Sequence, residues 1–250
     1  MTADRQTIRI LNTPIDKVDM NGALARVREY LDGNSGRAIF TPGSEFAWLA
    51  YKDMEFREML ETSDMNIPDG IGIVLASRIL GDRLPEKVAG IDLVSRTFAL
   101  DYPRKLRVFL VGSKPGIAVE AAVRIVEQYP NVEITGVRDG FFKPEDEAGI
   151  VDAIAASGSD IALVALGMKK QEGFIHRNLT RMNVKIALGV GGTIDVFAGH
   201  VRLAPDFYRR NHLEWFYRLM RQPSRFVRML ALPKFLFTVI AVKLKLIHTS

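Results

Sequence analysis

Cysteine is absent from the 250-residue sequence. The absence excludes disulfide frameworks, thiolate metal sites and cysteine nucleophiles, and it fits a reducing compartment. Long apolar runs are also missing, because no stretch reaches the roughly 18 consecutive apolar residues that a membrane-spanning helix needs. The N-terminal residues MTADRQTIRI are polar and show no apolar segment of a signal peptide. These absences predict a protein of the cytoplasm.

Signatures of metal and hydrolase chemistry are missing too. The four histidines are scattered, without an HxxxH or HExxH pair. The acidic cluster at residues 145–147 falls in the first turn of an expected helix, which favours a solvated face over a magnesium site. No Gly-x-Ser-x-Gly elbow is present. We therefore expect no metal, no serine nucleophile and no resident cofactor.

Complete glycine fingerprints for nucleotides are absent as well. Gly-x-Gly pairs begin at Gly70 and Gly189, but neither has the third glycine of the dinucleotide fingerprint. No Walker lysine pattern exists either. A nicotinamide enzyme is therefore disfavoured, although nucleotide binding in general stays open.

The positive charge of the chain is concentrated near its C-terminus. Residues 201–250 contain ten Lys or Arg and two acidic residues, a net charge of +8. The whole chain has a net charge of +5, which leaves −3 for the first 200 residues. Such a bias indicates an anionic partner, namely phosphate, nucleic acid or membrane headgroups.

Strand-like and helical patterns alternate from about Thr7 to Val190. Short β-branched runs that end near glycine alternate with segments whose apolar residues recur at helical spacing. This rhythm predicts an α/β fold, a Rossmann-like and mostly parallel sheet flanked by helices over residues 1–204. The clearest strand runs are RVFLVG (107–112), NVEITGV (131–137), DIALVALG (160–167) and VKIALGVGG (184–192).

After Pro205 the alternation stops, and Pro223 and Pro233 interrupt the chain. Large apolar side chains and arginines share this segment, as in helices at a membrane interface. Residues 205–250 are therefore predicted to form a basic, amphipathic, membrane-associating appendage. The alternative is that they pack onto the sheet as ordinary final helices, and both can hold for different halves.

Four loops follow expected strands and lead into expected helices. Ligands of open α/β sheets bind beyond the carboxyl ends of the strands, where such loops lie. Gly112 and Asp195 within them are candidates for substrate binding. The loops are TPGSE (41–45), PDGIG (68–72), VGSKPG (111–116) and GVGGTID (189–195).

Asp69 in the PDGIG loop has two interpretations. Its carboxylate can cap the following helix by accepting backbone N–H bonds, or it can take a proton from a hydroxyl nucleophile at the sheet edge. Similar alternatives apply to Thr41 or Ser44 as a helix cap, and to Gln171 and Glu172 as an exposed first turn. The local sequence leaves these alternatives open.

Several blocks in order resemble the WecG/TagA/CpsF glycosyltransferases. They run from about Ile39 to Arg228, which is most of the chain, and blocks in a shared order are more specific than one glycine loop. The blocks are TPGSEF, IPDGIGIVLASRILG, EKVAGIDL, VFLVGSKPGIAVEAA, YPNVEITGVRDGFF, LGMKKQE, GVGGTIDVFAGHVRLAP and LEWFYRLMRQPSR.

The resemblance implies an enzyme that moves a hexose from a UDP-sugar to a polyprenyl-diphosphate-linked saccharide, with inversion and without a metal. The hexose would be N-acetylmannosamine, its uronic acid or a glucose-type sugar. The product would enter a surface polysaccharide or teichoic acid. Such an enzyme would sit peripherally on the inner face of the cell membrane, bound to an anionic lipid surface.

The resemblance also implies roles for individual residues. Asp69 occupies the position of the general base, and Thr41 and Gln171 match polar residues that line the sugar-nucleotide pocket. Phe141 falls where an aromatic side chain lies near the nucleotide. Arg218, Arg225 and Arg228 match arginines of a C-terminal appendage that closes over the site in the family. By this resemblance Arg218 is a catalytic residue, and Arg225 and Arg228 bind the substrate.

Some positions depart from the family pattern. Gly43 replaces a usual asparagine, and Lys87 a usual arginine, so that Lys87 keeps the charge but loses the bidentate fork. Both positions belong to the predicted donor site, so they bear on the choice of sugar or on the level of activity. Lys169 and Gln222 are further departures, from a proline and a glutamate.

Two other functions stay open on the sequence. A nucleotide-binding protein that lost catalysis would explain Gly43 and Lys87. A nucleic-acid-binding protein would use the basic tail, but the aromatics there alternate with leucines and prolines, and no nucleic-acid motif is present. We therefore expect no nucleic-acid partner, whereas a homo-oligomer is compatible with the sequence.

Overall fold

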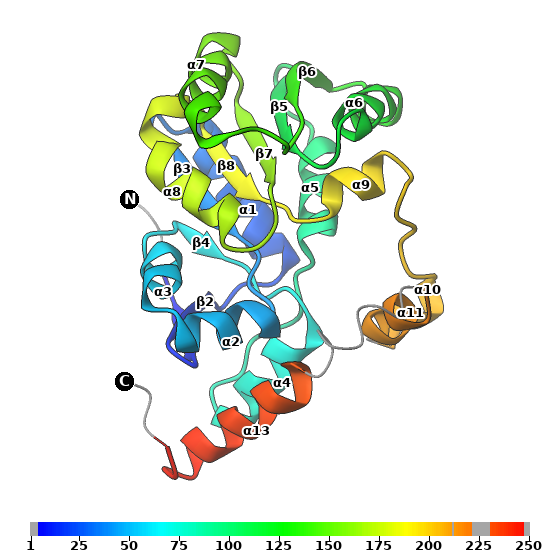
Figure 1. The fold of residues 1–250 in the computed structure, drawn as a ribbon. Coiled ribbons are helices and arrows are strands. Elements are labelled where there is room, and N and C mark those ends of the chain that lie inside the picture. Colours follow the sequence, from blue (N-terminus) through cyan, green and yellow to red (C-terminus); the bar gives the residue numbers. More distant parts are fainter. Residues whose placement is uncertain (1–4, 212, 222–230, 248–250) are drawn as a thin grey trace.

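A six-stranded sheet organises the molecule (Figure 1). The computed structural model describes residues 5–211, 213–221 and 231–247. Neighbouring strands all run parallel, in the order β4-β3-β8-β7-β5-β6. The predicted α/β architecture with a mostly parallel sheet is confirmed. The strands are β3 (Arg37–Phe40), β4 (Met65–Asn66), β5 (Leu106–Gly112), β6 (Val132–Arg138), β7 (Ile161–Ala165) and β8 (Ile186–Gly189).

Helices cover both faces of the sheet, and each face has its own apolar cluster. One face is covered by α1 (Met20–Asp32), α5 (Gly90–Phe98), α6 (Ile117–Gln128) and α9 (Thr193–Phe197). The other is covered by α2 (Ser44–Lys52), α3 (Met54–Glu61), α7 (Glu147–Ser157), which follows the short η1 (Pro144–Asp146), and α8 (Lys170–Met182).

The apolar spacing of the sequence explains why these helices pack as they do. In α6 the buried residues are Ile117, Ala118, Ala121 and Ile125. Their spacings of three and four place them on one stripe, which faces the sheet. This helix is thus one of the segments with helical spacing that alternate with strands in the sequence.

A β-hairpin precedes the sheet and was not predicted. Strands β1 (Thr7–Ile10) and β2 (Thr13–Asp16) pair antiparallel through a turn at residues 11–12, where both φ angles are positive. Leu-Asn is not among the dipeptides that usually mark such turns, which are Asn-Gly or Asp-Gly. The hairpin therefore left little signal in the sequence.

The end of this hairpin braces strand β4. The Asp16 carboxylate is fully buried between the guanidinium groups of Arg5 and Arg26, at 2.9 and 2.5 Å. Its Oδ2 also accepts a hydrogen bond from the backbone N–H of Asn66, at 2.7 Å. Because Asn66 ends β4, this bond fixes the strand from which the PDGIG loop departs.

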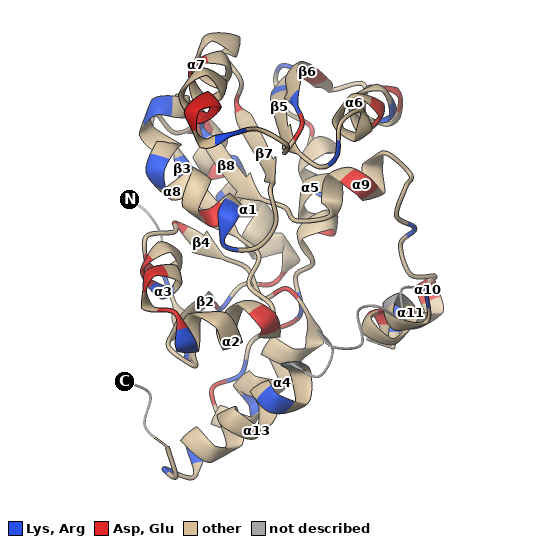
Figure 2. Ribbon diagram, in the orientation of Figure 1, with Lys and Arg blue, Asp and Glu red and all other residues tan. Residues whose placement is uncertain are grey.

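The C-terminal helices fall into two groups. Helix α13 (Ala231–Lys243) packs along α4 (Ile71–Leu80) and α2, with Phe235 and Val239 fully buried. Helices α10 (Asp206–Arg210) and α11 (Glu214–Arg221) stand away from the sheet and carry both signs of charge (Figures 1 and 2).

Packing as a final helix therefore holds for α13, whose main contacts are with helices α4 and α2. The predicted division of the chain at residue 205 stays a prediction. Among the described residues, none of the helices combines the length and the apolar character needed to cross a bilayer.

Candidate active site

The carboxyl edge of the sheet presents bare backbone to open space. Gly70 follows β4, Gly116 precedes α6, Gly167 follows β7, and Gly191 and Gly192 follow β8. A Cβ atom added at any of these glycines would meet no described atom within 4 Å. A ligand can therefore approach the backbone of several loops closely along this edge.

Asp69 lies at this edge, in the loop between β4 and α4. The N-cap of α4 is Gly70, at φ 105°, which has no side chain with which to cap the helix. Asp69 Oδ2 instead accepts a hydrogen bond of 3.4 Å from the N–H of Gly90, the first residue of α5. The N-cap position of α4 is thus Gly70 and not Asp69, and the choice between a capping and a catalytic role for the Asp69 carboxylate stays a prediction. The carboxylate faces the positive end of α5, which favours the anion.

Thr41 lies next to this carboxylate. A Cβ at Gly90 would lie 2.9 Å from Thr41 Cγ2 and 3.6 Å from Asp69 Oδ2. Thr41 Oγ1 donates to the carbonyl oxygen of Gly189 at 3.3 Å, across to β8. The prediction that Thr41 or Ser44 caps the next helix is wrong, because the N-cap of α2 is Gly43 and no described side chain caps it.

Gly43 fits a close contact between two loops. A Cβ atom at this position would lie 2.8 Å from the carbonyl oxygen of Asp69. The N–H of Asp69 also donates to the Pro42 carbonyl at 3.2 Å. A side chain at residue 43 would push these loops apart, so the departure from the family's asparagine bears directly on the position of Asp69.

Gln171 and Glu172 are buried at the start of α8, with exposures of 1% and 0%. The prediction that they form an exposed first turn is wrong. Glu172 Oε1 accepts from Gln171 Nε2, and Oε2 accepts from the N–H of Lys169, both at 2.7 Å. Gln171 Oε1 accepts from the N–H of Gly191 at 3.1 Å. Burial raises the pKa of the Glu172 carboxyl to about 7.

Gly112 and Asp195 lie further along the edge, around β5. A Cβ at Gly112, where φ is 132°, would lie 2.3 Å from the Ala165 carbonyl oxygen, so glycine is required for backbone fit. Asp195 Oδ2 accepts a hydrogen bond of 2.9 Å from Ser113 Oγ, which ties α9 to the loop after β5.

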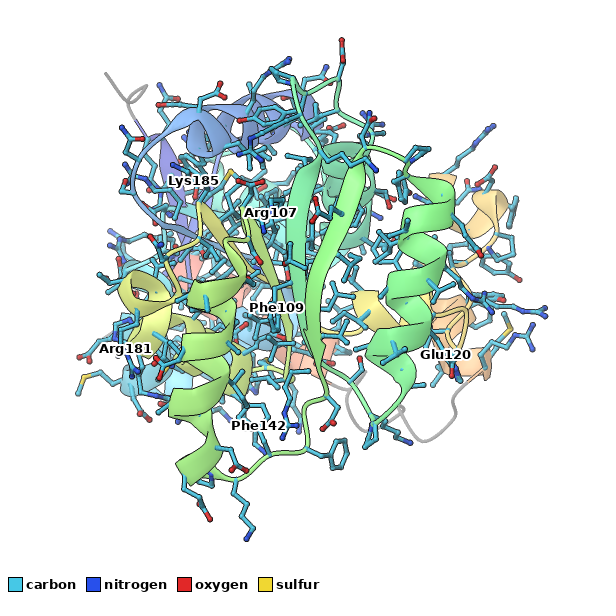
Figure 3. All side chains as sticks on the ribbon, turned by 90° about the horizontal axis from the view of Figure 1, so that it is seen from above. Arg107, Phe109, Glu120, Phe142, Arg181 and Lys185 are labelled. Atoms are coloured by element: carbon cyan, nitrogen blue, oxygen red, sulfur yellow. The ribbon has the colours of Figure 1, made fainter. Side chains whose placement is uncertain are left out.

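Two phenylalanines follow edge strand β6 and behave differently. Phe141 is 68% exposed. Phe142, labelled in Figure 3 in the connection to α7, packs against Phe174 with ring centroids 6.3 Å apart. An exposed aromatic ring beside a loop-lined edge is available for stacking on a base.

Lys87 is engaged by the C-terminal segment. Its Nζ pairs with Glu214 Oε2 of α11 at 2.5 Å, and its side chain is 11% exposed. Arg209 of α10 makes a second tie, to Asp92 of α5, at 2.6 Å. Arg218 belongs to α11, but its side chain lies outside the description, as do the predicted residues Arg225 and Arg228.

The structure therefore brings together part of the predicted set. Thr41, Asp69 and Gln171 gather around the ends of β3, β4 and β8 through Gly90 and Gly189. Glu214 was missed, although it is one of only two acids in a basic segment. Within the described residues, no group of three or more His, Asp or Glu side chains is arranged to hold a metal ion.

Comparison with known proteins gives a consistent result. The model of the "Glycosyl transferase WecG/TagA/CpsF family" matches residues 8–249. An N-acetylglucosaminyldiphosphoundecaprenol N-acetyl-beta-D-mannosaminyltransferase of Bacillus spizizenii is 39% identical over 211 residues, 84% of this chain and 81% of the relative. A protein of the same name from Bacillus subtilis is 36% identical over 236 residues, 94% of this chain and 91% of the relative.

Proposed function

Since the chain belongs to the glycosyl transferase WecG/TagA/CpsF family, we propose that it transfers a hexose from a UDP-sugar to N-acetylglucosamine on a polyprenyl diphosphate. Two relatives that align with most of the chain are named for N-acetylmannosaminyl transfer to such an acceptor. N-acetylmannosamine is thus the leading donor sugar. Its uronic acid and a glucose-type sugar are the alternatives, because Gly43 and Lys87 differ from the residues usual in the donor site of the family.

Asp69 acts as the general base in this proposal, and its position carries the proposal. It takes the proton of the acceptor hydroxyl while that oxygen bonds to the anomeric carbon of the donor. The bond from this carbon to UDP breaks, and UDP leaves with the electron pair. Attack from the face opposite UDP inverts the anomeric centre. The Gly90 N–H, 3.4 Å from Asp69 Oδ2, supports the anionic form that a base requires.

Positive side chains neutralise the departing diphosphate. Among the described residues, Lys87 is assigned to this role. The arginines of the C-terminal segment add bidentate hydrogen-bond donors. Lys87 Nζ pairs with Glu214 Oε2, so a donor diphosphate that binds Lys87 competes with Glu214 for the ammonium group. The arginines are Arg218, Arg225 and Arg228.

The C-terminal helices bring the site to an anionic membrane on its inner face. Large apolar side chains are exposed on α10, α11 and α13, beside basic residues, as expected for an interfacial segment. Each basic residue near such a surface contributes on the order of 1 kcal/mol. The exposed apolar residues are Phe207, Trp215, Phe216, Met220, Phe237 and Ile240.

The decisive test is Asp69→Asn with a donor screen. Release of UDP would be measured with a polyprenyl-diphosphate-linked N-acetylglucosamine and each candidate UDP-sugar. We expect turnover in the wild type with at least one donor, and a loss of about 10³-fold in the variant. UDP affinity and the unfolding transition should stay unchanged in Asp69→Asn. Asp152→Asn, on the surface of α7, is the matched control.

A variant that keeps full turnover would remove Asp69 from the role of base. The second candidate function, a nucleotide-binding protein without catalysis, is favoured by the contact of Lys87 with Glu214. It predicts calorimetric UDP binding without turnover on any of the donors.

A further inference from the structure

Glu172 is a fully buried carboxyl group that the proposed chemistry leaves without a role. Burying an ionisable group is costly unless its hydrogen-bonding capacity is used. Both oxygens of Glu172 accept bonds from neutral N–H groups, those of the Gln171 amide and the Lys169 backbone. Glu172 is therefore held in place by hydrogen bonds to both of its carboxylate oxygens and is not exposed to solvent.

These bonds fix the orientation of the Gln171 amide. A carboxylate only accepts hydrogen bonds, so Gln171 must turn its Nε2 toward Glu172 and its Oε1 toward the N–H of Gly191. The flipped amide would set oxygen against oxygen and N–H against N–H. A continuous chain thus runs from Glu172 through Gln171 to the backbone of Gly191.

The loop held in this way borders the catalytic edge. Gly191 and Gly192 face open space, and the carbonyl of Gly189 accepts from Thr41 Oγ1. Thr41 in turn adjoins Asp69. A small displacement of such a loop can cost a large part of the activity or affinity of a site.

We infer that Glu172 is a positioning residue that locks Gln171, and through it the glycine loop after β8, in the arrangement that receives the nucleotide diphosphate of the donor. The link to the donor rests on the proposed function. The link to the position of Gly191 does not, and the two can be tested separately.

Charged groups around the start of α8 pair with one another. Lys169 Nζ contacts Asp53 and Glu55, at 2.5 and 2.9 Å, and Arg177 contacts Glu147 of α7 at 2.9 Å. On the β3 side, Thr41 bonds the Gly189 carbonyl oxygen, and the acidic group near Thr41 is Asp69. The environment of Glu172 is thus set by burial, so its protonation follows the raised pKa of this carboxyl.

The alternative is that Glu172 only caps α8, as the third residue of a helix often does. Asp146 provides a matched control, because its Oδ2 accepts from the backbone N–H of Lys143 at 3.1 Å. The two acidic residues therefore make the same type of cap, and only Glu172 continues to a glutamine and a loop.

The first experiment follows amide exchange at Gly191 in the full-length, ligand-free protein. We expect Glu172→Ala and Gln171→Ala to speed exchange of this N–H about tenfold or more, since its acceptor is displaced. Asp146→Ala should leave it unchanged. Unaltered exchange in Glu172→Ala would overturn the inference. Glu172→Gln, which keeps the volume, should also speed exchange, and it keeps the test valid if the alanine variant does not fold.

The second experiment measures UDP affinity between pH 6 and 8.5. We expect wild-type affinity to strengthen as pH rises through about 7, where the carboxylate forms. Glu172→Gln should lose this component, and titration of UDP itself is common to both proteins. Gln171→Ala and Gln171→Ala/Glu172→Ala should be equally weak, by about tenfold.

Identical pH profiles in the wild type and Glu172→Gln would overturn the link to the donor. Absence of UDP binding in the wild type would contradict the proposed function, whereas the exchange result at Gly191 would stand independently.

Discussion

Two regions contribute to the candidate site, and they are held by different interactions. The sheet edge is fixed by buried hydrogen bonds, such as that between Gln171 and Glu172. Helices α10 and α11 are tied to the sheet domain by ion pairs, Lys87 with Glu214 and Arg209 with Asp92. Buried bonds resist salt and solvent, whereas partly exposed ion pairs respond to both. In the proposed function, the sheet edge carries the chemistry, and the ion-paired helices respond to a membrane or an anionic ligand.

Helix α13 does not share the behaviour of α10 and α11. Its Phe235 is fully buried against α2, α4 and the hairpin, while Phe237 on the same helix is 72% exposed. Part of the C-terminal segment is therefore core, although it follows the ion-paired helices in sequence.

The largest expected effect tests this core. Phe235→Ala should lower the free energy of unfolding by about 3–5 kcal/mol, because a buried aromatic ring leaves a cavity. Phe237→Ala should change it by less than about 0.5 kcal/mol. Urea unfolding of both variants measures the difference. Equal losses would show that α13 is not anchored as described.

The second-largest effect is expected in the pH dependence of the free energy of unfolding, to which the buried Glu172 contributes. The pKa of Glu172 rises from 4.5 to about 7 on folding, so the folded state binds more protons between these values. Its contribution is fully present below about pH 4.5 and is lost as pH rises through about 7. The loss is on the order of 3 kcal/mol.

Glu172→Gln should flatten this component of the pH profile, measured by urea unfolding from pH 4.5 to 8. The same slope in the variant and in the wild type would exclude Glu172 as its source. Asp146→Asn, an exposed cap, should retain the wild-type profile.

The ion-paired region should show a smaller, salt-dependent effect. A double-mutant cycle of Lys87→Gln and Glu214→Gln should give a coupling energy of about 1 kcal/mol that shrinks in high salt. Glu214→Gln should also bind UDP a few-fold more tightly, because Lys87 is released. The exposed pair Arg181–Asp152 is the control and should couple less. Weaker UDP binding in Glu214→Gln would contradict the competition.

The smallest effect on folding is expected on the exposed face. Phe216→Ser should change the free energy of unfolding by less than about 0.5 kcal/mol, since Phe216 is 41% exposed. The same change should weaken binding to phosphatidylglycerol vesicles several-fold, in a sedimentation assay. Val126→Ser on α6 should bind vesicles like the wild type. Equal vesicle binding by all three proteins would remove α11 from the membrane contact.

The sequence predicted the repeating core well, because RVFLVG and the helix after it carry periodicities that local physics determines. It missed the hairpin, whose turn lacks glycine. An exposed first turn is one interpretation of Glu172 in the sequence, because no local pattern shows that β8 packs against it, where a Cβ at Gly189 would lie 3.2 Å from Glu172 Oε1. The pairing of Lys87 with Glu214 joins positions 127 residues apart, and no local pattern encodes it.

The apolar cluster that unites the hairpin with α13 has a consequence for synthesis. Ile8 and Ile10 belong to the same cluster as Phe235 and Val239. On the ribosome the hairpin emerges before α13, and more than two hundred residues separate it from the helix that completes its cover. The nascent chain therefore carries an incomplete apolar surface until α13 has been translated, and a chaperone has that interval in which to bind it.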